Sequence, residues 1–169
     1  GRTSQKAGNA GLSELDPGYS YDWLAGEYAA ALLRESISKN RVEFINHETF
    51  YGKTEIMGHT ILFEHGAALR GGGFGGLPYY SIDKVFPAYR DLEGEFSLLL
   101  IGHYHRPYIL PAGYGSWLVG DGSFTPTTPY VVASKHRATR PAQSLLSIHP
   151  KRGLTMSRWL YLDTVRKAS

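Results

Sequence analysis

A run of apolar residues near the middle of the chain, Phe96–Ile101, constrains the fold most. Only Ser97 interrupts it, and apolar side chains without alternation are typical of a strand that is covered on both faces. The sequence Gly-His-Tyr-His at residues 102–105 follows directly. Binding groups collect at the carboxyl ends of such strands. Because glycine lets the backbone turn without steric cost, His103 and His105 could face one site or diverge toward two neighbouring ions.

A second strand that ends in a histidine is predicted upstream. Residues 60–63 are β-prone, and Glu64-His65-Gly66 follows them. A lone histidine at such a place is more often a structural residue. Three histidines at two equivalent strand ends instead favour a metal site, and imidazole suits manganese, iron, zinc, nickel or copper. The chain has no cysteine, so no thiolate narrows that choice.

These two motifs resemble those of the calcineurin-like metallophosphoesterases, and in particular the phage and archaeal phosphodiesterase-like members. His65 matches the family's lone histidine near a strand end, and residues 102–105 match its final Gly-His-x-His motif. The resemblance implies two divalent metal ions, with manganese as the first choice and zinc, iron or nickel as alternatives. It implies that His65 and His103 bind the second ion and that His105 binds the first. The implied activity is phosphodiester hydrolysis, with DNA or RNA as candidate substrates.

Three other motifs of that family, Asp-x-His, Gly-Asp-x-x-Asp and Gly-Asn-His, are absent from the sequence. Residues 1–6 resemble the segment that follows Gly-Asn-His in phage-type members. We therefore expect residues 1–169 to form a single or partial domain, the C-terminal half of a metallophosphoesterase. The expected catalytic histidine would then lie upstream of Gly1. An N-terminal half or a partner chain would supply both this histidine and the missing metal ligands. This chain alone would then be inactive.

The expected fold class is α/β: the C-terminal half of a metallophosphoesterase β-sandwich, with mixed sheets flanked by helices. A length of 169 residues is typical of one domain. No apolar run approaches the roughly 18 to 20 residues of a membrane span, and no signal segment is recognisable at the start. We expect a cytoplasmic protein that does not bind a membrane. The expected location includes the cytoplasm of a phage-infected host cell.

Candidate substrate contacts lie beside these motifs. Tyr104 and Arg106 flank the histidines, and the forked donors of an arginine suit phosphate, although both residues could equally be packing residues. The glycine-rich segment 71–76 contains Gly72 and Gly73, where backbone could approach a phosphate, or it is a plain flexible loop. The basic stretch 135–140 is open to the same two interpretations. The other histidines, which are predicted to be structural or exposed, are His47, His59, His136 and His149.

The remaining pattern predicts the order of the elements. A helix is expected over residues 21–39, with Asn40 in the left-handed conformation at its end. Strands are expected over 42–46 and 54–63 with a turn at 50–53, followed by a helix over 81–92 that Pro87 kinks or ends. Short strands are expected at residues 108–110, 116–119, 130–133, 144–149 and 155–162.

Two other functions stay open. One is an accessory protein of the same fold that binds a partner and catalyses nothing, which the missing motifs favour. The other is a metal-independent nucleic-acid-binding module that uses aromatic and basic loops, since 13% of the residues are aromatic. A net charge of only +3 gives little support to the second, and burial in strands explains most of the aromatic residues.

Overall fold

The structure is a computed structural model that describes residues 21–47, 49–66, 69, 79–127, 129, 132 and 139–163. The chain divides into two compact units, residues 1–52 and 53–169. Each unit is described by itself below. Of the helices in the described residues, none is both long and apolar enough to span a membrane.

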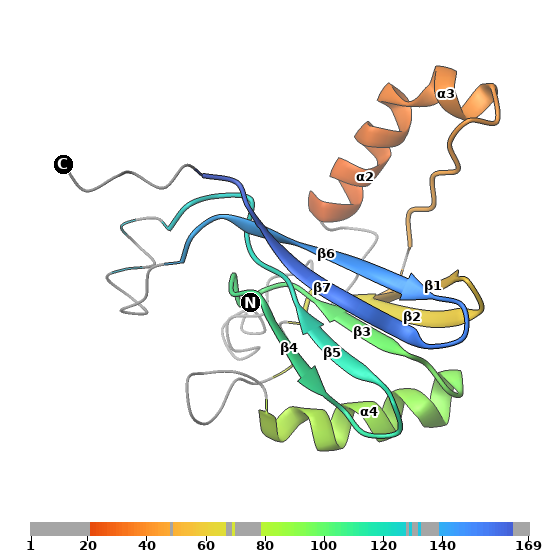
Figure 1. Ribbon diagram of the computed structural model, residues 1–169. Helices are drawn as coiled ribbons and strands as arrows, with labels where there is room; N and C mark the ends of the chain where they lie inside the picture. The colour runs from red at the N-terminus through yellow and green to blue at the C-terminus, as the bar shows by residue number, and fades with distance from the viewer. Residues whose placement is uncertain are drawn as a thin grey trace, which may run out of the picture. The chain divides into compact units, whose positions relative to one another are not determined.

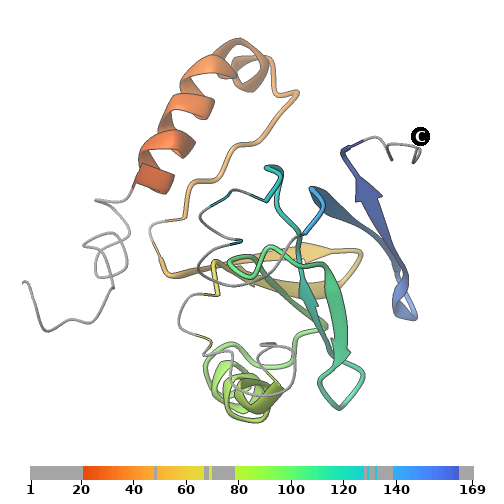
Figure 2. The same ribbon diagram turned by 90° about the vertical axis from the view of Figure 1, so that its left-hand side faces the viewer.

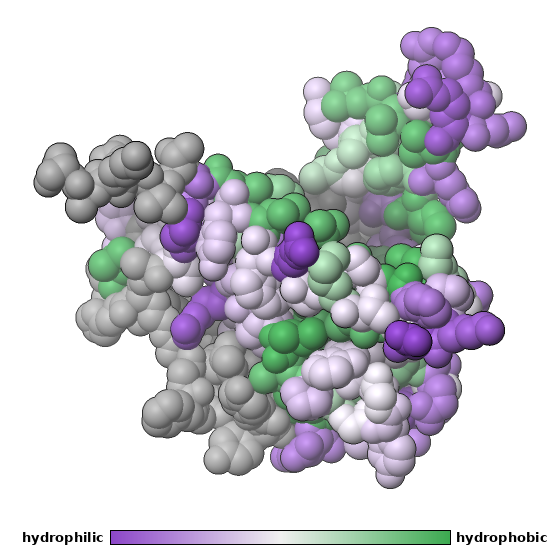
Figure 3. All heavy atoms as spheres, viewed as in Figure 1, coloured by the Kyte–Doolittle hydropathy of each residue, from purple (hydrophilic) through white to green (hydrophobic). Residues whose placement is uncertain are grey.

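In the described part of the first unit, helices α2 (Tyr21–Leu32) and α3 (Arg34–Ser38) lie where the sequence predicts a single helix. Asn40 takes the predicted left-handed conformation, with φ of 53°. Its amide donates to the carbonyl of Ile37, which closes the helical segment. Apolar side chains of α2 stay exposed, and the helix is largely green in Figure 3.

The predicted strand 42–46 is wrong, because these residues have no regular structure. A side-chain contact within the first unit gives the physical reason. The Asn46 amide donates to the carbonyl of Trp23 at 3.1 Å and to the Glu27 carboxylate at 3.0 Å. A Cβ at Gly26 would lie 2.7 Å from Asn46 Oδ1. The segment is therefore held along α2 by side-chain hydrogen bonds, without a partner strand among the described residues.

The second unit is built on a five-stranded mixed sheet with the order β1-β2-β3-β5-β4. Its strands β2, β3 and β5 are parallel, and β4 is antiparallel to β5. The hairpin β6–β7 forms a second, antiparallel sheet. The bounds are β1 (Tyr51–Ile56), β2 (His59–Glu64), α4 (Tyr79–Glu93), β3 (Leu98–Ile101), β4 (Tyr108–Pro111), β5 (Trp117–Gly120), β6 (Ala142–His149) and β7 (Gly153–Tyr161). The predicted α/β class is confirmed, with one mixed sheet and one antiparallel sheet.

Two predictions about the start of this unit are wrong. The strand predicted over 54–63 is split between β1 and β2, and residues 51–53 belong to β1 and form no turn. The turn lies instead at Met57 and Gly58, whose φ angles are 52° and 78°. Two successive left-handed residues are typical of a tight type I′ hairpin turn, in which methionine is an unusual choice.

Strand β3 is covered on both faces, as predicted. Leu98 and Leu99 point to opposite faces of the sheet, and both are 0% exposed. On the face of Leu98, residues of the five-stranded sheet pack against Leu146 and Ile148 of β6 and Leu154 of β7. On the other face, α4 contacts the sheet through Tyr89 and Glu64. The unit therefore has a helix layer and two sheet layers, which Figures 1 and 2 show from two sides.

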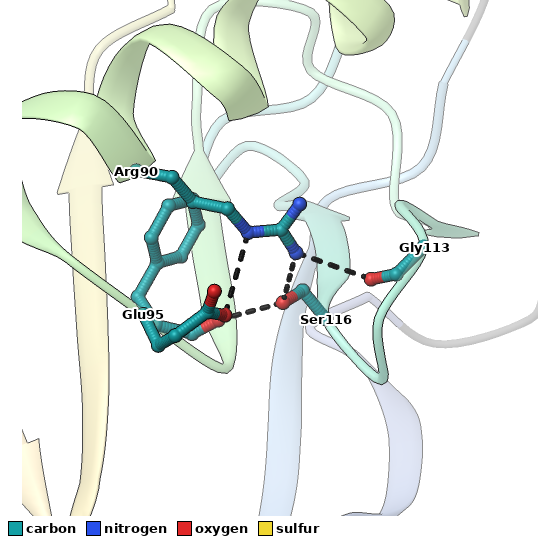
Figure 4. A network of polar contacts seen from close by, with 5 residues as sticks. Arg90, Glu95, Gly113 and Ser116 are labelled. Atoms are coloured by element: carbon teal, nitrogen blue, oxygen red, sulfur yellow. Dashed lines mark hydrogen bonds and ion pairs between the residues drawn. The ribbon is translucent and has the colours of Figure 1, made fainter.

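Helix α4 confirms the helix predicted over residues 81–92, and of the two effects predicted for Pro87 it excludes an end, because the helix continues through Pro87 to Glu93. Near its C-terminal end, Arg90 donates to the carbonyl of Gly113 at 3.2 Å and to Ser116 Oγ at 2.9 Å (Figure 4). Glu95 forms an ion pair with the same guanidinium at 3.5 Å. Ser116 is buried and donates in turn to the carbonyl of Phe96. This network ties α4 to the β4–β5 turn and to the start of β3.

We expect Arg90→Lys to lower the free energy of unfolding by about 1–2 kcal/mol, because an ammonium group cannot reach both acceptors as the planar guanidinium does. Urea denaturation followed by circular dichroism measures the effect. Arg152→Lys in the exposed β6–β7 turn is the matched control, and its expected change is within about 0.5 kcal/mol. Equal stabilities of the two variants would contradict a structural role of the Arg90 network.

Candidate metal centre at the strand ends

The carboxyl ends of β2, β3 and β5 meet at one edge of the five-stranded sheet. Their last residues are in register, with Glu64 paired to Ile101 and Ile101 paired to Gly120. The residues that follow these strands are therefore neighbours, and they include His65 and His103. Parallel strands thus bring together two histidines that are far apart in the sequence.

His65 and His103 are in direct contact. Nδ1 of His103 lies 3.1 Å from Nε2 of His65. The ring centroids are 5.0 Å apart and the rings are nearly perpendicular, at 82°. In a hydrogen bond at this distance, one imidazole nitrogen donates and the other accepts, so the accepting nitrogen is unprotonated.

The backbone turn after β3 was expected at Gly102, and it lies elsewhere. Gly66 has a φ of 88°, and a Cβ there would lie 3.2 Å from Cβ of Ile101, so glycine suits this position. Gly102 has no such requirement, because a Cβ would meet the carbonyl oxygen of His65 at 3.5 Å and its Nδ1 at 3.9 Å, which are ordinary contacts. The left-handed residues of the motif are His103 and His105, with φ of 62° and 54°. The turn after β3 is therefore made by the histidines.

His105 does not join the pair in a common group. The described residues contain no group of three or more His, Cys, Asp or Glu side chains that could hold a metal ion. His105 is exposed. The assignment of His65, His103 and His105 as metal ligands stays a prediction.

The chemistry of the pair fits part of a metal site. Two imidazole nitrogens that bind one zinc ion at about 2.0–2.1 Å with tetrahedral geometry lie roughly 3.4 Å apart, close to the 3.1 Å between His65 and His103. Catalytic zinc sites use three protein ligands and structural sites use four. The described residues therefore supply an incomplete ligand set, and further ligands would have to come from elsewhere.

Glu64 is a polar residue of this edge that the sequence analysis did not single out. Its Oε2 accepts a hydrogen bond from the Tyr89 hydroxyl at 2.9 Å, and its Oε1 is buried without a partner in the described part of the chain. Burial raises the pKa of this carboxyl group, while the Tyr89 hydrogen bond and the charge of His65 act in the opposite direction. A carboxylate at the last position of a buried strand is a signal that could have identified it.

Asp121, directly after β5, is a second such residue. Its Oδ1 accepts three hydrogen bonds, from the amides of Gly122 (2.9 Å) and Ser144 (2.8 Å) and from Ser144 Oγ (2.9 Å). A Cβ at Gly122 would lie 2.3 Å from the carbonyl oxygen of Ala142, so the two segments pass very close to each other. Asp121 therefore fastens the start of β6 to the end of β5.

The predicted substrate contacts fall into three groups. The Tyr104 hydroxyl donates to the carbonyl of Leu69, and burial raises its pKa, as does nearby Glu64 to a smaller extent. This hydroxyl therefore makes a structural contact within the chain. Arg106 is partly buried. Gly72 and Gly73 lie outside the described residues.

Of the basic stretch, Lys135 and Arg137 also lie outside the described residues. Arg140 forms a bidentate pair with Asp163, with nitrogen–oxygen distances of 2.8–3.2 Å, and lies over the ring of Tyr161 at 4.2 Å. The guanidinium is thus occupied by partners within the chain, which favours a structural role for Arg140 over a phosphate contact.

His59 and His149 have structural contacts, as predicted. Nδ1 of His59 lies within hydrogen-bonding distance of Ser97 Oγ, at 3.0 Å, and its Nε2 lies 3.1 Å from the carbonyl oxygen of His149. Nδ1 of His149 accepts from the amide of Lys151 in the β6–β7 turn. His47 is partly buried in the first unit, and His136 lies outside the described residues.

A scan against protein-family models finds no match, and a search of curated proteins finds none either. Among solved structures, the chain is similar to Vps29 from Entamoeba histolytica complexed with zinc, at 17% identity over 72% of this chain and 67% of that chain, with a TM-score of 0.45. It is also similar to a predicted phosphoesterase from Streptococcus pneumoniae, at 14% identity over 70% and 65% of the two chains, with a TM-score of 0.39. A third is Vacuolar Protein Sorting 29 from Cryptosporidium parvum, at 14% identity over 69% and 59%, with a TM-score of 0.41.

The chain spans about two thirds or less of the length of these structures. With TM-scores below 0.5 and identities below 20%, the similarity establishes neither a family nor an activity.

Proposed function

We propose that this chain provides part of a metal-dependent phosphoesterase centre that hydrolyses phosphodiesters. The observation that carries the proposal is the contact between His65 and His103, at the edge where three parallel strands end. When bound, two divalent ions would generate a hydroxide near neutral pH and stabilise the oxygens of the displacement. Neutral imidazoles suit this role because they bind such ions without adding negative charge that would repel a phosphate.

The resemblance to calcineurin-like metallophosphoesterases supports the finer assignments. His65 and His103 would hold one ion and His105 the other, with manganese preferred over zinc, iron or nickel. The remaining ligands and the catalytic histidine would come from an N-terminal half or a partner chain. Because its forked donors suit a phosphate, Arg106 is the favoured candidate for the contact with the substrate phosphate. The substrate would be DNA, RNA or a smaller diester in the cytoplasm.

The second candidate function is that of an accessory protein that catalyses nothing. One specific observation favours it: no group of three potential ligands occurs among the residues that the structure describes. The two functions differ in turnover, because an accessory protein hydrolyses no phosphodiester, whether or not the histidine pair holds a metal ion.

Metal binding and hydrolysis together test the proposal. We expect calorimetry with MnCl2 or ZnCl2 to show weak binding to this chain that His65→Ala and His103→Ala each abolish. His149→Gln, which alters an exposed histidine at the end of β6, is the matched control and should bind as the wild type does. Bis-nitrophenyl phosphate should be hydrolysed at the background rate, because the ligand set is incomplete.

Adding the polypeptide that carries the missing motifs should restore metal-dependent turnover, and His103→Ala should abolish it. Absence of metal binding by the wild type, together with absence of turnover in the completed protein, would favour the accessory function. Turnover by this chain alone that survives both histidine variants would show that the catalytic groups lie elsewhere.

A further inference from the structure

Four aromatic rings form a continuous series that ends at the histidine pair, and we call His65, His103, Tyr104 and Tyr108 the ring series. Consecutive centroids are 5.0 Å apart for His65–His103, 5.4 Å for His103–Tyr104 and 6.3 Å for Tyr104–Tyr108. The interplanar angles are 82°, 89° and 71°. Edge-to-face contacts at these separations are favourable, each by about 0.5–1.5 kcal/mol beyond area burial.

The far end of the series rests on the sheet. Tyr108 of β4 is the register partner of Gly120 in β5. A Cβ at Gly120 would lie 2.2 Å from Cε1 and 2.4 Å from Cζ of Tyr108, so the ring occupies the space that any side chain there would need. Tyr108 is 8% exposed, and its buried hydroxyl has no partner among the described residues. Its ring, and not its hydroxyl, makes the contacts that hold it.

The middle of the series is anchored on both sides of the site. The Tyr104 hydroxyl donates to the carbonyl of Leu69, in the segment after β2. The Tyr104 amide donates to the carbonyl of Gly102 at 2.7 Å, in the loop after β3. Tyr104 therefore connects the segment that follows His65 with the loop that carries His103.

His103 needs such support because of its backbone. Its φ of 62° lies in the left-handed region, which costs a residue with a Cβ about 1–2 kcal/mol. The next residue, Tyr104, places its ring edge-to-face against the imidazole of His103. The contact opposes relaxation of this loop to an ordinary conformation, in which the imidazole would point elsewhere.

We propose that Tyr104 and Tyr108 are positioning residues: the ring of Tyr108 packs against Gly120, and the ring of Tyr104, between Tyr108 and His103, holds the imidazole of His103 against His65. The consequence for metal affinity rests on the proposed function, but the ring geometry does not. The residues act through His103 and need no contact with a substrate or a metal ion. This assigns to Tyr104 a role other than the substrate contact expected from the sequence.

The test begins with nuclear Overhauser effects between ring protons in protein labelled at histidine and tyrosine. In the wild type we expect cross-peaks for all three consecutive pairs of the series. Tyr104→Leu should lose the His65–His103 cross-peak, whereas Tyr104→Phe, which keeps the ring, should retain it. Tyr28→Leu, at an exposed position of α2 in the first unit, is the matched control and should leave every cross-peak unchanged.

Gly120→Ala provides an independent variant, because the added methyl group displaces Tyr108 without touching either histidine. It should also weaken the His65–His103 cross-peak. With ZnCl2 as the probe, we expect both Tyr104→Leu and Gly120→Ala to lower affinity by about 10–100-fold, as is usual for residues that orient metal ligands. Tyr104→Phe should stay close to the wild type.

The outcomes separate the two proposals. Missing cross-peaks in the wild type, a His65–His103 cross-peak that persists in folded Tyr104→Leu and Gly120→Ala, or an equal loss in Tyr104→Phe would each overturn the positioning role. If Tyr104→Leu does not fold, the wild-type cross-peaks and Gly120→Ala still decide. If the cross-peaks behave as expected but the wild type binds no zinc or manganese and the completed protein shows no turnover, the positioning role stands and the proposed function falls.

Discussion

Asp121→Ala is expected to lower the free energy of unfolding by about 3 kcal/mol, because hydrogen bonds to a charged acceptor contribute roughly 1.5–3 kcal/mol each and do not add fully. The variant removes the acceptor of all three bonds to Oδ1. It also leaves the amide of Ser144 without its partner at the start of β6. Urea denaturation followed by tryptophan fluorescence measures the loss.

Two further variants define the origin of this effect. Asp121→Asn keeps an oxygen acceptor at the same place but loses the charge, so we expect about half of the destabilisation. Asp91→Ala removes an exposed carboxylate of α4 and should change stability by no more than about 0.5 kcal/mol. If Asp121→Ala unfolds at the same urea concentration as Asp91→Ala, Asp121 does not fasten β6 to β5.

The sequence was sufficient to predict the strand ends and the meeting of two histidines. The apolar run of β3 without alternation indicates burial on both faces, and 0% exposure of both Leu98 and Leu99 bears this out. Parallel neighbours then bring His65 and His103 to one edge. These features follow from local pattern and from a general rule of parallel sheets, so no knowledge of distant contacts was needed.

The features that were missed depend on distant partners or on backbone conformation. Nothing around Asp121 indicates that Ser144, 23 residues further on, donates to its carboxylate. The left-handed φ angles of His103 and His105 are a second such feature, because propensity assigns these angles first to glycine, which has no Cβ. The segment 42–46 has β-prone residues, but side-chain hydrogen bonds through Asn46 compete with strand pairing.

Leu98→Ala is expected to cause the largest loss of stability, about 3–5 kcal/mol, because a buried Leu→Ala change loses transfer free energy and leaves a cavity. Leu98 is 0% exposed and packs with Ile61 and Val119 where the five-stranded sheet meets β6 and β7. Neighbours on both sheets surround the site, and strand backbones fixed by ladder hydrogen bonds cannot collapse easily into the space. Urea denaturation again provides the measurement.

Two leucine variants test whether the cavity is the cause. Leu98→Met nearly conserves the side-chain volume and should cost less than about 1.5 kcal/mol. Leu92→Ala removes the same atoms from a side chain of α4 that is 72% exposed, so its expected change is within about 0.5 kcal/mol. A Leu98→Ala protein as stable as Leu92→Ala would mean that the two sheets are not packed against each other at this residue. Because the histidine pair lies beyond the ends of β2 and β3, its ring contact should persist in Leu98→Ala as long as the second unit remains folded.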